Sequence, residues 1–175
     1  MKNNQTVFSR NVIEFITVAS EFCKFMEQAD GKLRDPFVDT TLKLLPLLYL
    51  KSLLLPPLEP LGEEGTQRFV TEETYEVLRI TLGEIMGDRD AYLDVFVKDM
   101  RYSDQPIKCS VGEGLADIYQ SLKDCVSAYA LGGTENMHEA LAACREEFIE
   151  YWGQTLVNTL RALHEIKFNS ENDDD

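Results

Sequence analysis

The chain has 175 residues and a mass of 20.0 kDa, with 44% hydrophobic residues and a formal net charge of −14. This length and apolar content are typical of one folded domain and exclude a mainly disordered chain. The 31 acids and 17 bases exclude free nucleic acid as a direct partner and disfavour an anionic membrane, because both require clustered Lys and Arg. We therefore expect the partner to be another protein with a basic or an apolar surface.

The acidity is unevenly distributed along the chain. Residues 1–56 carry six acids and seven bases, whereas residues 57–175 carry 25 acids and 10 bases. Four of these acids stand in residues 170–175, which we expect to be a disordered acidic tail after a domain spanning residues 1–169. The acidic surface is thus predicted to belong to the later helices of the domain.

The first residues contain no apolar stretch followed by a small-residue cleavage site. We therefore expect no secretion signal and a cytoplasmic location. Four cysteines are widely spaced, without a C-x-x-C pair, which is typical of reduced thiols. Three of them lie on predicted apolar helix faces and should pack as small hydrophobes: Cys23, Cys125 and Cys144.

Hydrophobic periodicity predicts the first two helices over residues 9–28 and 36–55. Asp35 and Pro36 form a start signal for the second, with a side-chain acceptor before a proline at the first helical position. This second helix is rich in leucine, and two interpretations remain open. It is either a central helix buried on most sides, or a partner-binding surface with leucines exposed. Lys43 falls in its apolar run, so the helix is too polar to span a membrane.

A proline-rich segment, residues 56–62, is predicted to be a loop within the same domain. The remaining helices are predicted over residues 71–86, 90–100, 110–131 and 134–167. In the short helix over 90–100, we expect Tyr92, Val95 and Phe96 to point inward. The fold class is therefore all-α: a single-domain helical bundle of five to six helices, with short loops and a long C-terminal helix.

Three local patterns resemble a known family. The last helix contains Tyr151-Trp152-Gly153-Gln154-Thr155 and then Arg161-Ala162-Leu163-His164, the helix before it contains Ala116-Asp117-Ile118-Tyr119, and the second contains Leu44-Leu45-Pro46-Leu47. In this order they resemble the bacterial family called domain of unknown function 5063, over about residues 7–167. The resemblance implies a small α-helical bacterial protein with no assigned activity, and it supplies no catalytic residue.

Motifs for catalysis and metal binding are weak in this sequence. Glu135-Asn136-Met137-His138 matches the Glu-x-x-His motif of carboxylate-bridged metal bundles, but the motif has no second copy. There is no nucleophile elbow, phosphate loop or dinucleotide fingerprint. We therefore predict no catalytic residue, no metal site and no cofactor.

Four residues are the candidates for ligand binding: Arg161, His164, Asp117 and Trp152. Arg161 and His164 lie one turn apart and could together hold a carboxylate or a phosphate. His164 also stands near a helix C-terminus, where a protonated imidazole is favoured without any ligand. Trp152 lies on an apolar stripe, where tryptophan commonly belongs to the core.

The sequence favours a non-enzymatic protein–protein interaction or accessory module with an acidic recognition face. The alternative is a small-molecule or metal-binding helical bundle, which could be an enzyme, using a polar patch around Arg161 and His164. A third interpretation is a self-associating structural protein, with which the long final helix is compatible.

Overall fold

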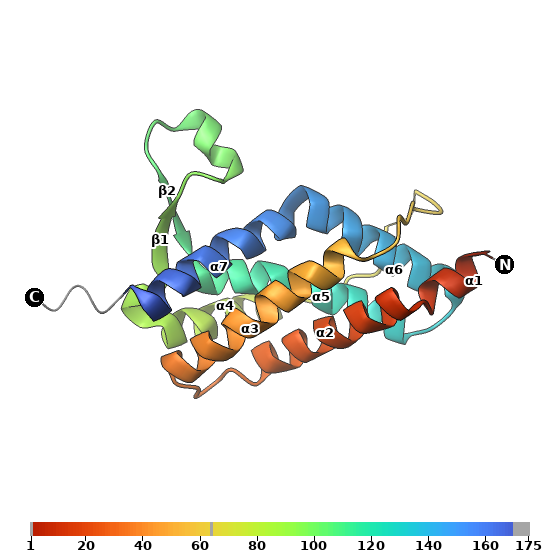
Figure 1. Ribbon diagram of the computed structural model, residues 1–175, viewed down its shortest axis with the longest axis horizontal. Coiled ribbons are helices and arrows are strands. Elements are labelled where there is room, and N and C mark those ends of the chain that lie inside the picture. The colour runs from red at the N-terminus through yellow and green to blue at the C-terminus, as the bar shows by residue number, and fades with distance from the viewer. Residues whose placement is uncertain (1, 64, 170–175) are drawn as a thin grey trace, which may run out of the picture.

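Helices α2, α3, α5 and α7 run side by side along the long axis of the molecule, and a β-hairpin projects from one side (Figure 1). The computed structural model describes residues 2–63 and 65–169, and the predicted tail over 170–175 lies outside them. The elements are α1 (Lys2–Val7), α2 (Arg10–Glu27), α3 (Arg34–Leu53), α4 (Glu72–Met86), β1 (Ala91–Asp94), β2 (Ile107–Ser110), α5 (Val111–Ala130), α6 (Thr134–Glu147) and α7 (Gly153–Phe168). The predicted helical bundle is confirmed.

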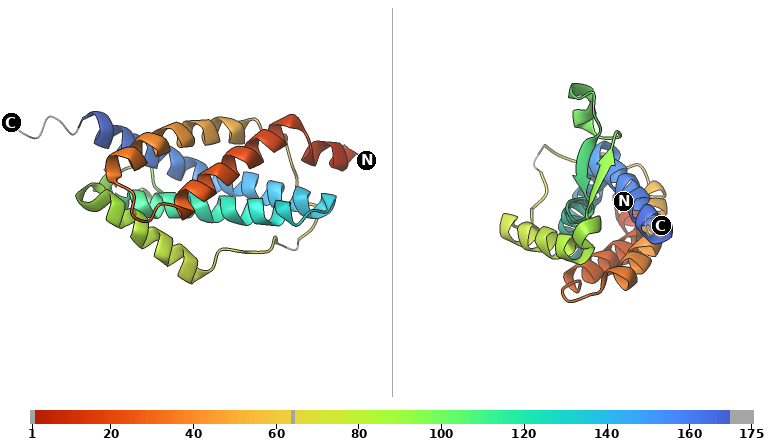
Figure 2. Two further views of the ribbon diagram at one scale, coloured as in Figure 1. Left: turned by 90° about the horizontal axis from the view of Figure 1, so that it is seen from below. Right: turned by 90° about the vertical axis from the view of Figure 1, so that its left-hand side faces the viewer.

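Helix α5 is the centre of the bundle. It packs against α4, α2, α6 and α7, while α3 lies between α2 and α7 on the opposite side of the molecule from α4 (Figure 2). Its inward face carries fully buried Leu115, Ile118 and Leu122. This burial explains why the apolar stripe of α5 recurs at three- and four-residue steps.

Local signals in the sequence set several helix ends. The Thr71 hydroxyl accepts a hydrogen bond from the Thr74 amide at 3.1 Å at the start of α4, and Gly87, with φ of +57°, follows its end. The Ser110 hydroxyl accepts from the Glu113 amide at 3.0 Å at the start of α5. By contrast, α3 begins at Arg34, before the predicted start at Pro36, and its N-cap is Leu33 without a side-chain hydrogen bond.

The predicted short helix over residues 90–100 is wrong. Residues Ala91–Asp94 form β1, which pairs antiparallel with β2, and a 3₁₀ turn over Lys98–Tyr102 follows. Val95 and Phe96, which were expected to point inward, are exposed. The strand forms because of a partner that lies beyond a loop, and a short apolar run does not reveal such pairing.

The predicted final helix is helical throughout but not regular. Helix α6 passes into α7 through one π-helical turn, Phe148–Trp152, where the axis bends (Figure 1). A Cβ atom at Gly153 would lie 2.5 Å from the Phe148 carbonyl oxygen, so glycine is required directly after this turn. Trp152 is fully buried and donates its indole N–H to the Cys144 carbonyl at 3.1 Å.

The leucine-rich helix α3 supports parts of both interpretations. Leu45 and Leu48 are fully buried, whereas its outer face and its C-cap residue expose four leucines: Leu47, Leu50, Leu53 and Leu54. The expected burial of Cys23, Cys125 and Cys144 is confirmed. Among the helices of the described residues, none is long and apolar enough to cross a membrane.

A second close backbone approach that needs a glycine lies between two helices, α4 and α5. A Cβ atom at Gly112 would stand 2.7 Å from the Gly83 amide nitrogen, a distance that real Cβ atoms do not adopt. A Cβ atom at Gly83 would instead meet only the Asp90 side chain, at an ordinary 3.8 Å. A Cβ atom is therefore tolerated at Gly83 but not at Gly112.

We predict that Gly112→Ala lowers the free energy of unfolding by about 1–3 kcal/mol. The added methyl group would clash with backbone atoms of α4, and these can move away only if the two helices shift apart. The matched variant Gly83→Ala should leave it unchanged or raise it by up to about 1 kcal/mol, since alanine favours a helix interior. Urea unfolding followed by circular dichroism measures both values. Equal stability of the two variants would contradict this account of the α4–α5 contact.

Candidate functional site

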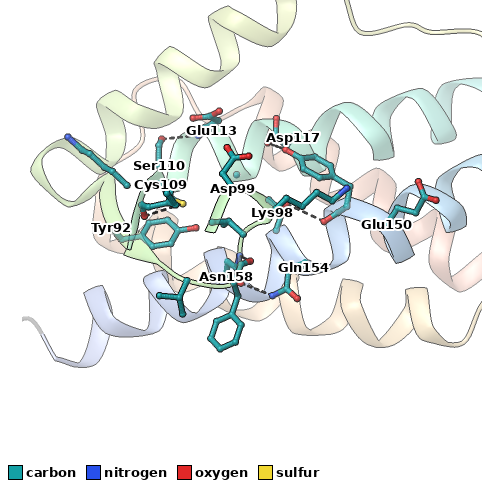
Figure 3. A pocket seen from close by; sticks show the side chains of 18 of the residues that line it. Tyr92, Lys98, Asp99, Cys109, Ser110, Glu113, Asp117, Glu150, Gln154 and Asn158 are labelled. Carbon is teal, nitrogen blue, oxygen red and sulfur yellow. Dashed lines mark hydrogen bonds between the residues drawn. The ribbon is translucent and has the colours of Figure 1, made fainter. Parts of the chain in front are cut away.

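A hollow of about 750 Å³ lies where the β-hairpin meets α5, the π turn and the start of α7 (Figure 3). We call it the hairpin groove. Its lining residues are Tyr92, Val95, Phe96, Val97, Lys98, Asp99, Ile107, Lys108, Cys109, Ser110, Glu113, Gly114, Asp117, Ile149, Glu150, Tyr151, Gln154, Thr155 and Asn158. Volume and lining are those of a site for a ligand or for a short segment of another protein.

The base of the hairpin is fixed by Asp90. One carboxylate oxygen accepts from the Ser110 hydroxyl and the other from the Gly112 amide, both at 2.7 Å. The Asp90 carbonyl also accepts from the Val111 amide at 2.9 Å. These bonds tie the end of β2 and the first turn of α5 to the start of β1, so the hairpin and the helix beneath it are positioned together.

A second aspartate fixes the far end of β1. Asp94 is 2% exposed, and one of its oxygens accepts from the Val95 and Phe96 amides at 2.7 and 2.9 Å. Its other oxygen accepts from Arg161 of α7 at 3.1 Å, and the same guanidinium nitrogen donates to the Leu93 carbonyl at 3.2 Å. A buried carboxylate needs such partners, so Asp94 and Arg161 anchor the hairpin to α7.

The residues that follow β1 are held by two side-chain amides of α7 that are hydrogen-bonded to each other. Buried Asn158 donates to the Phe96 carbonyl at 2.9 Å, and Gln154 donates to the Asn158 side-chain oxygen at 2.8 Å. The segment that forms one wall of the hairpin groove is therefore bonded to the helix that forms another. This arrangement predetermines the groove before any ligand arrives.

Asp117 connects three elements at one end of the groove. Its two carboxylate oxygens accept from the Tyr75 hydroxyl of α4 and the Tyr151 hydroxyl of the π turn, each at 2.6 Å. Burial first, and then the hydrogen bond to Asp117, raises the pKa of Tyr75 and of Tyr151 above the ordinary tyrosine range. Both phenols therefore stay protonated donors at neutral pH.

Other reactive side chains of the groove are also held protonated. Burial raises the pKa of Tyr92 to about 12. Burial, together with the nearby carboxylates of Asp94 and Glu113, raises the pKa of the Cys109 thiol. A thiol that resists ionisation is a poor nucleophile, so Cys109 lacks the chemistry expected of a catalytic cysteine.

Carboxylates outnumber bases in the groove. The lining carries Asp99, Glu113, Asp117 and Glu150 but only two bases, Lys98 and Lys108. The carboxylates come from the hairpin, α5 and the π turn, and Figure 3 shows Asp99 and Glu113 toward one end of the groove and Glu150 apart from them toward the other. Among the ion pairs of the part of the chain that the structure describes, none includes any of these four carboxylates.

The four candidate residues predicted from the sequence do not form one cluster. Asp117 lines the groove, Trp152 lies in the core, and Arg161 anchors the hairpin. His164 is exposed near the end of α7, with its ring 4.8 Å from that of Phe168. A joint ligand role for Arg161 and His164 stays a prediction.

Sequence reasoning missed Tyr75 and Tyr151 as partners of Asp117. Tyr151 stands beside Trp152 in the motif that suggested the family, but the π turn alters which residues of that stretch share a face. Within the described residues there is no group of three or more His, Cys, Asp or Glu side chains that could hold a metal ion. The buried His138 of the Glu-x-x-His motif instead has its Nε2 atom 2.8 Å from the Glu59 carbonyl oxygen.

Two comparisons with known proteins found similarity. The family model for the domain of unknown function (DUF5063) matches residues 6–169. The chain is also similar to the crystal structure of protein BF1032 from Bacteroides fragilis, a structural genomics target, with 49% sequence identity and a TM-score of 0.83. That match covers 94% of this chain and 96% of the other. No curated protein matches the chain.

We predict that Asp117→Asn lowers the pKa of Tyr75 and Tyr151, because the variant removes the negative charge that opposes phenolate formation. A pH titration of phenolate absorbance would show a larger share of the tyrosines ionised at a given strongly alkaline pH than in the wild type. Asp99→Asn is the matched control, because it removes a groove carboxylate that accepts no tyrosine hydroxyl. Identical titration curves for all three proteins would contradict the assigned hydrogen bonds.

The same bonds predict an alkaline limit to stability. Because folding raises the pKa of Tyr75 and Tyr151, the folded protein holds their protons more tightly than the unfolded chain. Their contribution is therefore fully present below about pH 10, the ordinary tyrosine pKa, and is lost as the pH rises above it. The free energy of unfolding should fall less steeply above that pH in Asp117→Asn, as measured by urea unfolding at several pH values. An equal slope in both proteins would refute this.

Proposed function

The chain belongs to the DUF5063 family, a family of unknown function, and from its groove we propose that it is a non-enzymatic protein-binding module. In this proposal the hairpin groove receives a segment of another protein that carries Lys or Arg next to apolar side chains. The observation behind the proposal is a preformed groove whose carboxylates outnumber its bases and form no ion pair among the described residues. An unpaired carboxylate at an interface favours a cationic partner group.

The electrostatic part of the proposal rests on Glu113, Asp117 and Glu150. These carboxylates come from α5 and the π turn and all line the groove, with Glu150 apart from Glu113 toward the other end (Figure 3). A cationic side chain entering there would meet the Asp117 carboxylate beside the Tyr151 side chain that donates to it. Carboxylates and aromatic faces are both favourable partners for a guanidinium or ammonium group.

The apolar part of the proposal rests on three exposed side chains at the rim. Val95 and Phe96 follow β1, and Ile149 belongs to the π turn, so they come from different elements that line the groove. Large exposed apolar side chains beside a groove are typical of a surface that is covered by a partner. A partner segment with both basic and apolar residues would pair with the carboxylates and also cover the exposed apolar side chains at the rim.

Binding is favoured over catalysis by the state of the groove's reactive groups. Cys109 and Tyr92 are held protonated, and both oxygens of Asp117 already accept hydrogen bonds. None of these groups is poised to attack a substrate or to take a proton from it at neutral pH. The same groups are well suited to a static recognition surface.

A peptide-display selection against the full chain tests this function. We expect it to enrich peptides with Lys or Arg near apolar residues, and we expect the double variant Glu113→Gln/Glu150→Gln to bind them about tenfold more weakly, a loss of about 1.4 kcal/mol. Both substitutions keep the side-chain size and remove only charge. Isothermal titration calorimetry with the selected peptides would measure the difference.

The matched control is Glu72→Gln/Glu73→Gln, which removes two exposed carboxylates from the first turn of α4, outside the groove lining. This control should bind the selected peptides nearly as well as the wild type. Selection of peptides without basic residues, or equal loss of affinity in both double variants, would show that the groove is not the basic-peptide site.

A further inference from the structure

The outer face of α3 is an apolar surface without a covering element in the described residues. Leu47, Leu50, Leu53 and Leu54 are 41–58% exposed, and we call this set the leucine face. Positions 47, 50 and 54 follow the three- and four-residue spacing of one helix stripe. Scattered apolar residues are ordinary on a protein surface, but a continuous stripe indicates a contact surface.

The neighbouring helices extend the leucine face. The 2.6 Å ion pair between Lys51 and Glu14 sets α2 alongside the C-terminal half of α3, and exposed Ile13 lies at this level. On the other side, the Tyr49 and Phe148 rings are 5.4 Å apart, which sets α7 and the π turn alongside α3. The leucine face therefore belongs to a broad side of the molecule formed by three packed helices.

This side of the molecule does not share the acidity of the chain. Helices α2 and α3 together contain five bases and five acids, whereas the whole chain has a net charge of −14. Beside the middle of the leucine face, Arg10 and Lys51 share Glu14, and one turn before its first residue, Lys43 and Lys167 share Asp39. Two bases on one carboxylate leave each of these clusters with a charge of +1.

The acidic surfaces lie elsewhere. Helix α4 and the hairpin, with the hairpin groove beneath it, lie on other sides of the molecule from α3 (Figure 2). Two copies that met through the leucine face would thus keep their acidic grooves apart. A mutual contact through the grooves would instead bring like charges together, which costs free energy.

We propose that the leucine face binds a second copy of this chain, with the two α3 helices antiparallel across a two-fold axis. An isologous contact requires a surface that complements itself, and a leucine stripe does so. In this arrangement, the Lys43 cluster of each copy lies beside the segment that follows α3 in the other. That segment carries the exposed Glu59 and Glu63, so the ends of the contact are complementary in charge.

The solution mass of the full chain tests the proposal. At about 100 µM, a dimer with a Kd of about 1 µM is almost fully formed, so light scattering should give twice the chain mass of 20.0 kDa. Leu50→Glu should return the mass to that of one chain, because a charge would be buried at the centre of the contact. Circular dichroism shows whether this surface variant retains its fold.

The matched control uses exposed apolar residues of α4. Val77 and Ile80 are 60% and 50% exposed, so Val77→Glu/Ile80→Glu adds charge to an equally exposed helix face that the proposal leaves free. The control should remain dimeric. A monomeric wild type at about 100 µM, or a folded Leu50→Glu variant that stays dimeric, would overturn the proposal.

A charge exchange tests the antiparallel arrangement. Lys43→Glu should raise the dimer dissociation constant several-fold, and adding Glu59→Lys to it should restore much of the affinity. Failure of the second substitution to restore any affinity would reject this arrangement of the two helices. Because the leucine face and the groove are separate surfaces, peptide binding by Leu50→Glu distinguishes this proposal from the proposed function.

Discussion

The hydrogen bonds of Asp117 to Tyr75 and Tyr151 connect the groove with the bundle. They join α4, α5 and the π turn through one carboxylate whose two oxygens are both used. If the π turn were a regular helical turn, the side chains after Glu147 would be displaced around the axis, and Tyr151 would lose its position facing Asp117. The π turn therefore places Tyr151 at Asp117 and in this way helps to determine the shape of the groove.

The net negative charge of the chain is distributed unevenly over its surface. On α5 and the π turn, carboxylates without ion pairs in the described residues line a groove and create an attractive field for cations. On α2 and α3, acids and bases are equal in number, and exposed leucines dominate instead. The two proposed contacts, with a basic segment and with a second copy of the chain, therefore use separate surfaces and do not compete.

Helices with one apolar stripe and a capping residue could be predicted from the sequence, as α4 after Thr71 and α5 after Ser110 illustrate. The hairpin could not, because its stability comes from strand pairing and from Arg161, which lies far away in the chain. Asp117 was one of the four residues that the sequence offered as candidates for ligand binding. Its tyrosine partners were missed because they lie on two other elements, and only the folded chain brings them together.

The central claim is that a basic segment of another protein occupies the hairpin groove. Photo-crosslinking in cells of the source organism tests it most directly, with a photoreactive phenylalanine analogue at Phe96 in the groove and, in a second protein, at the equally large and exposed Phe8 outside it. We predict a specific crosslinked partner from position 96, attached through a segment rich in Lys or Arg, that Glu113→Gln/Glu150→Gln removes. The same crosslinks from both positions, or attachment through an acidic segment, would contradict the account.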